Sequence, residues 1–310
     1  MTTHIAPTPQ LRFSHANGLQ LAYFERNTAE PGRPTLLFVH CTGFHGRVWD
    51  RIIEAFPDAH TIALEQRGHG RSDKHAVSHW DVFGQDIAAF IVALKLERVI
   101  GIGHSLGAHA LVDAAALTAA SQNTSSQDPA ARAPSFQRLV LCDPTIAEPC
   151  AYGRPPPFVK QGDIHPAAKR RAQFASPAQM QEQLRGKGSY PLFEARVFVD
   201  YCEHGLLPDG EGQFMLACPP AIEASVYMAA RTNIGIFESV RALKIAVHIL
   251  RAKLPPAEHT AFDFSSSPTW PALVNEFRLG TEEHLADCSH FIPMQMPARV
   301  IAAVRKAMIA

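Results

Sequence analysis

Short runs of consecutive apolar residues recur along the chain and are separated by longer amphipathic stretches. Runs of this kind are typical of strands that are buried on both faces of a parallel sheet. They are found at residues 35–39, 61–64, 99–102, 139–142 and 245–250. Two earlier runs, 11–13 and 19–24, flank Asn17-Gly18, a dipeptide that favours the tight turn of a hairpin. The pattern therefore predicts an amino-terminal hairpin followed by strands of a parallel sheet.

Helical periodicity appears between these runs. Residues 81–94 place their apolar side chains on one helical stripe. Residues 106–120 are rich in alanine, a strong helix former, and residues 297–309 begin with a proline, which is favoured in a first helical turn. A last strand is expected at 281–286. Strands that alternate with helices predict an α/β fold, with a mainly parallel sheet and helices on both of its faces.

The alternation stops after the strand at 139–142. Residues 144–240 show no comparable rhythm, and we expect them to form a mainly helical insertion over the sheet. The remaining residues, 1–143 and 241–310, are expected to form the α/β core. The polar segment 121–135 is predicted to be a surface loop. The helices expected in the insertion span residues 167–174, 177–184, 191–204 and 221–240.

Composition and charge narrow the range of functions. The 310 residues include 29 Lys and Arg and 29 Asp and Glu, so the formal net charge is zero. This balance argues against binding to nucleic acids or to anionic membranes through bulk charge. No apolar run approaches the length of a membrane span. Six cysteines are scattered without metal-binding spacing, and we interpret them as reduced thiols of a cytoplasmic protein.

The segment from Gly103 to Gly107 reads Gly-His-Ser-Leu-Gly and matches the pattern G-x-S-x-G. A predicted strand precedes it and an Ala-rich predicted helix follows it, which is the context of a nucleophile elbow. A serine in so sharp a turn has strained backbone geometry, and glycines two residues away on either side remove steric collisions. The free N–H groups of the following helix can stabilise a developing oxyanion. We therefore predict that Ser105 is a nucleophile.

The same glycines allow one other interpretation, a dinucleotide-binding loop. Gly101, Gly103 and Gly107 resemble the G-x-G-x-x-G fingerprint, but Leu106 occupies the position of its third glycine. The match also lies well inside the chain instead of after a first strand. A nicotinamide-dependent reductase is therefore the weaker hypothesis.

The sequence resembles the α/β-hydrolase superfamily, and specifically its capped members with a serine nucleophile. Besides residues 103–107, the resemblance rests on His-Cys-Thr-Gly-Phe at 40–44, Arg-Gly-His-Gly-Arg-Ser at 67–72 and Ser-His-Phe-Ile-Pro-Met at 289–294. It covers nearly the whole chain, with residues 144–240 in the place of the family's cap.

The resemblance implies roles for individual residues. Ser105 would attack the substrate and His290 would act as general base, with the backbone N–H groups of Thr42 and Leu106 forming the oxyanion hole. Cys41 stands where the family usually has a glycine. His40 and the segment 67–72 are interpreted as structural. His104 is expected to support the site without taking part in the chemistry, because neighbouring side chains in a sharp turn point apart.

Three carboxylates compete for the role of the acid that orients His290. The family's usual position, beyond the strand at 245–250, corresponds to Pro255, which cannot orient an imidazole. Asp143 ends the preceding strand, and some relatives place their acid there. Glu258 and Asp263 lie further along the chain and remain alternatives. Because an orienting carboxylate needs only to reach Nδ1 of the histidine, we predict Asp143.

We expect a hydrolase that cleaves a small, largely apolar ester, lactone or related carbonyl compound through an acyl-enzyme, without a metal or an organic cofactor. A serine at the elbow argues against the relatives with an aspartate nucleophile, the haloalkane dehalogenases and epoxide hydrolases. C–C bond hydrolysis and perhydrolysis on the same site remain alternatives, as does a slow-turnover sensor. Phe44, Trp49 and Phe291 are candidate pocket residues. The expected partner is a small-molecule substrate.

Overall fold

A mixed sheet forms the centre of the molecule. The computed structural model describes residues 7–122, 135–154, 164–256 and 264–309, and within them eight strands pair in the order β1-β2-β4-β3-β5-β6-β10-β11. β1 and β2 form an antiparallel hairpin, β2 is antiparallel to β4, and all other neighbours are parallel. The strands are β1 (Gln10–Ala16), β2 (Leu19–Arg26), β3 (Thr35–Val39), β4 (Thr61–Leu64), β5 (Val99–His104), β6 (Phe136–Cys142), β10 (Ala246–Ala252) and β11 (Gly280–Leu285).

Alternating side chains on each central strand enter two separate apolar cores. In β3, Leu37 and Val39 belong to one core, and Leu36 and Phe38 belong to the other. A strand whose side chains are apolar on both faces must be covered on both faces. The mainly parallel sheet, predicted from the apolar runs, is therefore confirmed together with its two helical layers.

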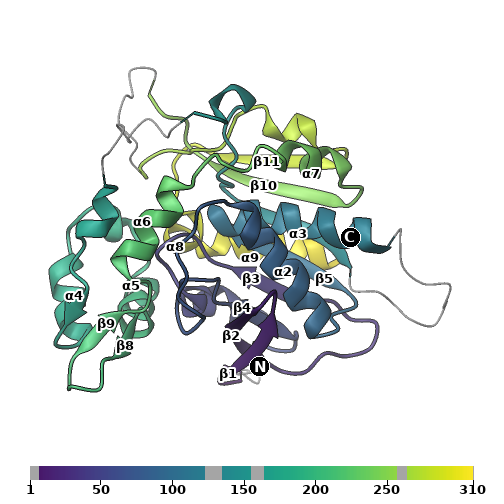
Figure 1. The fold of residues 1–310 in the computed structure, drawn as a ribbon. Helices are drawn as coiled ribbons and strands as arrows, with labels where there is room; N and C mark the ends of the chain where they lie inside the picture. The colour runs from purple at the N-terminus through teal and green to yellow at the C-terminus, as the bar shows by residue number, and fades with distance from the viewer. Residues whose placement is uncertain (1–6, 123–134, 155–163, 257–263, 310) are drawn as a thin grey trace.

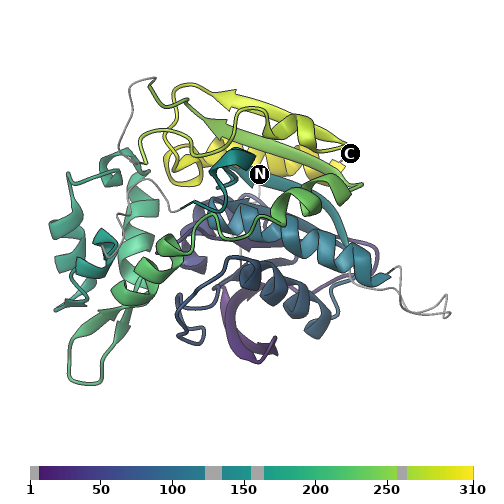
Figure 2. The same ribbon diagram turned by 45° about the horizontal axis from the view of Figure 1, so that its top comes forward.

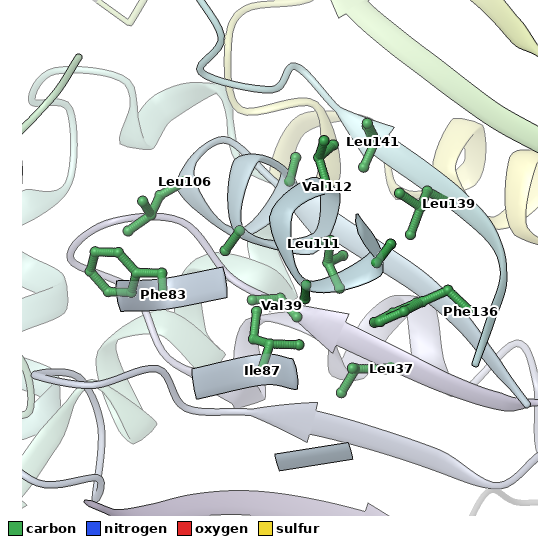
Figure 3. Close-up of a cluster of buried hydrophobic side chains, with 14 of the residues drawn as sticks. Leu37, Val39, Phe83, Ile87, Leu106, Leu111, Val112, Phe136, Leu139 and Leu141 are labelled. Carbon is green, nitrogen blue, oxygen red and sulfur yellow. The ribbon is translucent and has the colours of Figure 1, made fainter. Parts of the chain in front are cut away.

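Helices cover the two faces of the sheet (Figure 1). The first layer consists of α2 (Asp81–Ala93), α3 (Leu106–Gln122) and α7 (Ile236–Ala242). Figure 3 shows this core, where side chains of α2 and α3 meet the face of the sheet that presents Leu37 and Val39. The second layer consists of α1 (Asp50–Ile53), α8 (Ile292–Gln295) and α9 (Pro297–Ile309).

The described residues from 164 to 228 gather at one end of the molecule, in teal and green at the left of Figure 1 and again in Figure 2. Their main helices are α4 (Pro177–Leu184), α5 (Ala195–His204) and α6 (Pro220–Met228). They also contain a small antiparallel sheet, ordered β7-β9-β8, with β7 (Gln173–Phe174), β8 (Leu206–Pro208) and β9 (Phe214–Leu216). Short 3-10 helices lie at Gly46–Trp49, Pro149–Ala151, Pro166–Lys169, Tyr190–Leu192 and Leu273–Glu276.

The structure differs from two of the helices predicted in this region. Residues 167–174 form the end of a 3-10 turn and strand β7, since Phe174 is buried through pairing with β9 and not on a helical face. Residues 221–240 form two helices, α6 and α7, separated by a turn in which Arg231 has a φ of 67°. α7 packs against α3 in the core, so the expected boundary at residue 240 falls inside a helix. Most of the predicted polar loop, at 123–134, lies outside the described residues.

Candidate active site

The predicted nucleophile elbow joins β5 to α3. Ser105 adopts a φ of 56°, a left-handed conformation that is costly for a residue with a Cβ. A Cβ on Gly103 would lie 2.7 Å from the backbone of Ala108, and a Cβ on Gly107 would collide with the carbonyl oxygen of Val39. Both glycines are thus required for the close approach of strand, turn and helix. The turn projects the Ser105 hydroxyl at the carboxyl edge of the sheet.

The structure brings together three residues that are far apart in the sequence. Oγ of Ser105 lies 2.9 Å from Nε2 of His290, and Nδ1 of His290 lies 2.6 Å from Oδ2 of Asp143. The carboxylate requires the Nδ1–H tautomer of His290, which leaves Nε2 free to accept the serine proton. All three residues are buried. The arrangement is one in which a serine hydroxyl can be deprotonated by an oriented imidazole.

The Asp143 carboxylate is held by the chain that follows β10. Its Oδ1 accepts hydrogen bonds from the backbone N–H of Ala252 at 3.0 Å, from Oγ of Ser267 at 2.5 Å and from Oγ1 of Thr269 at 3.2 Å. These bonds leave Oδ2 for His290. The other two acids considered from the sequence, Glu258 and Asp263, lie outside the described residues.

His104 contacts the backbone of His290, the predicted general base. Its Nε2 donates a hydrogen bond to the backbone carbonyl of His290 at 2.8 Å, and the two rings are 4.9 Å apart. Complete burial holds the pKa of His104 well below its usual value, and the neighbouring His290 adds to this effect. His104 is therefore neutral, and its contact with His290 runs through the backbone and not through the reacting nitrogen.

A second pair of buried histidines shapes the loop after β3. The backbone N–H of Gly43 donates to Nε2 of His69 at 3.0 Å, and that of Gln66 donates to Nε2 of His40 at 3.1 Å. Burial lowers the pKa of His69 to about 4 and places that of His40 well below its usual value. Both rings are thus neutral acceptors, as a structural role requires. Within the described residues, the N–H of the neighbouring Thr42 has no protein acceptor.

The first turn of α3 supplies the other predicted oxyanion donor. Leu106 begins α3 directly after Ser105, and its N–H likewise has no protein acceptor among the described residues. Unpaired N–H groups at a helix N-terminus, aided by the helix dipole, are suited to binding an anion. The Ser105 hydroxyl also contacts Oγ1 of Thr145 at 2.9 Å. Since Ser105 donates its proton to His290, Thr145 is the donor in this second contact.

A small cavity of about 50 Å³ opens at Ser105. Its walls come from the core, from the end of α6 and from the chain after β10. The lining residues are Thr42, Trp80, Ser105, Thr145, Ala147, Tyr227, Ala230, Arg231, Phe264 and Pro268. A larger cavity of about 320 Å³ lies between α3, α7 and the start of β6, at the opposite edge of the sheet from Ser105. The lining near Ser105 is mostly apolar, with few polar groups to orient a ligand.

The three residues expected to line the pocket lie elsewhere. Trp49 is fully buried against Phe38, with ring centroids 5.4 Å apart. The ring centroids of Phe44 and Phe291 lie 5.7 Å apart, and both rings belong to an aromatic cluster that includes Phe193. None of the three is among the residues that line the cavity at Ser105, because Trp49 packs inside the core and the other two rings pack against Phe193 of the insertion.

Several lining residues were missed by the sequence analysis. Thr145 follows Asp143 by two positions, and no sequence pattern marked it. Tyr227 and Arg231 lie in the stretch predicted as a single helix, so no position relative to Ser105 could be assigned to them. One sequence signal could have indicated a break in this predicted helix. It is the pair Asn233 and Gly235, since both residue types are typical of turns.

An ion pair within the insertion lies beside the loop after β3. Nη1 of Arg170 lies 2.5 Å from Oε2 of Glu223, and Nη2 of Arg170 donates to the hydroxyl of Tyr201 at 3.0 Å. Glu223 is so close to Gly43 that a Cβ on the glycine would lie 2.7 Å from Oε1. Burial raises the pKa of Glu223, and the Arg170 charge opposes that shift. The pair therefore links α6 to the segment before β7, beside the loop that carries Thr42.

The described residues contain neither a cluster of metal ligands nor a membrane-spanning helix. No group of three or more His, Cys, Asp or Glu side chains in these ranges is arranged to hold a metal ion. No helix in the described part of the chain has the length and apolar character needed to cross a membrane.

Known hydrolases resemble this chain in sequence and in fold. A lipase from Mycobacterium tuberculosis, Lipase LipV, is 24% identical over 278 residues, which cover 88% of this chain and 93% of the lipase. A 2-(acetamidomethylene)succinate hydrolase from Mesorhizobium japonicum is 39% identical over 93 residues, or 29% of this chain and 34% of that enzyme.

Solved structures show the same architecture. An E-2-(acetamidomethylene)succinate hydrolase superposes with a TM-score of 0.69 at 21% identity, covering 98% of this chain and all of the other. An enol-lactonase from Burkholderia xenovorans gives a TM-score of 0.62 at 15% identity, with 96% of this chain and 100% of the lactonase covered. The family model for the alpha/beta hydrolase family matches residues 36–303. This match spans most of the chain and the sheet topology agrees with it, so the chain belongs to the alpha/beta hydrolase family.

Proposed function

We propose that this protein is a serine hydrolase in which Ser105 is the nucleophile, His290 the general base and Asp143 the orienting acid. The continuous contact from Ser105 Oγ through both nitrogens of His290 to the Asp143 carboxylate carries the proposal. The left-handed elbow at Ser105 supports it, since strained geometry of this kind is typical of reactive serines.

The contacts suggest the order of events. Ser105 Oγ forms a bond to the substrate carbonyl carbon as its proton passes to Nε2 of His290. The N–H groups of Thr42 and Leu106 stabilise the oxyanion, and collapse of the intermediate expels the leaving group with the proton from His290. Water then attacks the acyl-enzyme as His290 takes its proton, and His290 returns that proton to Ser105 Oγ as the bond to the acyl carbon breaks and the carboxylic acid product leaves.

The cavity supports a small and largely apolar substrate. Trp80, Tyr227 and Phe264 contribute aromatic walls near Ser105, and the volume of about 50 Å³ leaves room only for a compact acyl group. Because Tyr227 belongs to α6, the segment 144–240 takes part in this wall, and we propose that it acts as a cap that selects substrates.

Esters and lactones are the favoured substrate class. The relatives include proteins named as a lipase and an enol-lactonase, both of which cleave a bond to an acyl carbonyl. The protein named as a 2-(acetamidomethylene)succinate hydrolase keeps cleavage of related carbonyl compounds open for comparison in the assays. Pro255 in place of the usual acid would favour a slow-turnover sensor, whereas the contact of Asp143 with His290 supports an enzyme.

The cysteines support a reducing compartment. Cys41, Cys142, Cys202, Cys218 and Cys288 are buried and free, and Cys150 is exposed and free. Cysteines that remain as free thiols are typical of proteins in the reducing cytoplasm. We therefore propose the cytoplasm as the location of this protein.

Covalent labelling tests the proposal directly. A fluorophosphonate should modify the native protein at Ser105, as mapped by mass spectrometry, and Ser105→Ala should abolish this label. The same substitution should lower kcat for short-chain esters by several orders of magnitude and leave the thermal unfolding profile unchanged. Normal ester turnover by folded Ser105→Ala protein, or labelling at another residue, would contradict the assignment.

A further inference from the structure

Among the described residues that line the cavity at Ser105, Arg231 carries the only formal charge. It follows α6 and is half-buried beside the aromatic wall. In a small apolar cavity a single guanidinium is an unusual lining group, because transfer of a cation away from water costs free energy unless a partner compensates it.

The backbone holds Arg231 in this position at a cost. Its φ of 67° is a left-handed conformation that few non-glycine residues adopt. The next two residues anchor the turn to the core: Oγ1 of Thr232 accepts the backbone N–H of Trp80 at 3.1 Å, and Nδ2 of Asn233 donates to Asp113 at 2.5 Å. The hydrogen bonds of Thr232 and Asn233 therefore hold the turn in place, and with it the position of Arg231 at the cavity.

No carboxylate of the described residues pairs with this guanidinium. The side chains that act electrostatically on the pKa of Arg231 are Tyr152 and Cys150, and neither is a carboxylate. Burial lowers the pKa of Arg231, as it does for a cation without a compensating anion. By contrast Arg170, on the other side of the insertion, is paired with Glu223. Arg231 thus retains unused capacity to bind an anion.

We propose that Arg231 binds a carboxylate of the substrate, so that the enzyme acts on small esters, lactones or related carbonyl compounds that carry a second, ionised carboxyl group. The inference rests on the proposed function, since it concerns the cavity at Ser105. A planar guanidinium binds a carboxylate through two parallel hydrogen bonds, which fixes the orientation of the ligand as well as its charge. The small cavity favours a carboxylate over bulkier phosphate or sulfate groups.

Matched esters test the charge preference. Monomethyl malonate, monomethyl succinate and monomethyl glutarate place a carboxylate at three distances from the ester carbonyl. Methyl 4-methylpentanoate replaces the carboxylate of monomethyl succinate with an uncharged branched group of the same shape. Methanol release gives kcat/KM for each. We expect at least one half-ester to exceed the neutral ester by roughly 10- to 100-fold, the range of a charge-assisted hydrogen-bonded pair.

Variants of Arg231 assign the preference to its side chain. Arg231→Gln should lower kcat/KM for the preferred half-ester by about 10- to 100-fold and change that for the neutral ester less than threefold. Arg231→Lys keeps the charge without the planar fork and should fall between the two. Arg185→Gln, a change at an exposed arginine after α4, is the matched control and should leave both values unchanged. Equal losses for both esters in Arg231→Gln would overturn the inference.

Binding to inactive protein separates this inference from the proposed mechanism. Calorimetry with the preferred half-ester on Ser105→Ala protein should show binding that Arg231→Gln weakens about tenfold or more. Fluorophosphonate labelling of Ser105 without any half-ester preference would leave the mechanism standing and reject the carboxylate site. Half-ester binding that depends on Arg231, in a protein that neither labels nor turns over, would reject the mechanism and retain the site.

Discussion

His104, the residue immediately before the predicted nucleophile, donates a hydrogen bond to the backbone carbonyl of His290 at 2.8 Å. The elbow and the loop of the proposed base are therefore connected by one buried bond besides the Ser105–His290 contact. Because His104 touches the backbone of His290 and not its reacting nitrogen, it is a positioning residue. Its contribution should be visible in kcat more than in KM.

A substitution at His104 should separate positioning from packing. His104→Phe keeps a ring but leaves the His290 carbonyl without its donor, which should destabilise the protein by about 1–3 kcal/mol. Loosening of the base should lower kcat by roughly 10- to 100-fold, as small misplacements of catalytic groups do, with KM little changed. His104→Gln restores a donor and should recover part of kcat. A wild-type kcat in folded His104→Phe would remove the positioning role.

The acid assignment predicts a large effect on rate. Asp143→Asn keeps the shape but permits the wrong tautomer of His290, and the comparable change in a well-studied serine protease costs about 10⁴-fold in kcat. Glu258→Gln and Asp263→Asn, at the alternative acids, should be mild by comparison. Steady-state kinetics on all three variants decides among them.

Stability must be measured alongside the rate of Asp143→Asn. Oδ1 of Asp143 accepts bonds from Ala252, Ser267 and Thr269, so the substitution also weakens a buried junction between β6 and the chain after β10. We expect a loss of about 1–3 kcal/mol in the free energy of unfolding. A strong rate loss in Glu258→Gln or Asp263→Asn, with Asp143→Asn active, would transfer the role to that residue.

The cap proposal predicts a change in acyl-chain preference. Tyr227→Ala removes an aromatic wall of the cavity and should raise kcat/KM for 4-nitrophenyl hexanoate relative to the acetate by about tenfold or more, since a pocket discriminates about 10- to 200-fold per methylene at most. Met215→Ala, at an exposed position of β9, is the control and should leave the ratio unchanged. Parallel changes for all chain lengths in Tyr227→Ala would argue that α6 does not select the acyl group.

The buried histidines predict a loss of stability in acid. Burial lowers the pKa of His69 to about 4 from an ordinary value near 6.5, so the unfolded chain binds more protons than the folded one between these values. The contribution of His69 to the free energy of unfolding is fully present above about pH 6.5. It declines as the pH falls toward 4, by about 3 kcal/mol in total. Protonation also breaks the acceptor role of Nε2 toward Gly43.

Chemical denaturation at several pH values measures this slope. His69→Gln keeps a hydrogen-bond acceptor but cannot titrate, so its free energy of unfolding should fall less steeply than that of the wild type between pH 6.5 and pH 4. Histidines 40, 45 and 104 have pKa values lowered in the same direction and will retain part of the slope. Identical slopes for His69→Gln and the wild type would show that the pKa of His69 does not differ between the folded and the unfolded protein.

Local pattern was sufficient for the elements of the core and for the sharp turn at Ser105. The apolar runs at 35–39 and 61–64 coincide with β3 and β4, and the hairpin forms at Asn17-Gly18, because strand and turn preferences depend on neighbouring residues. Ser105 could be identified from its glycines, since the steric demands of the elbow act over two residues on either side.

In the insertion local pattern was not sufficient. Short strands β7, β8 and β9 form only because they pair with one another, and the break between α6 and α7 depends on the anchoring of Thr232 and Asn233 to the core. Neither effect leaves a periodic signal. Propensity is a weak guide wherever tertiary contacts determine the backbone.

The α/β alternation, the serine in the turn after β5 and a short set of candidate acids follow from local sequence pattern. Tertiary contacts were needed to bring Oδ2 of Asp143 within 2.6 Å of Nδ1 of His290, across 147 positions of sequence, and to place Arg231 on the cavity that Ser105 also lines. The physical reason is the order of the strands. Side chains from distant segments meet at the carboxyl edge because β5, β6 and β10 are neighbours in the sheet, and hydrophobic periodicity carries no information on that order.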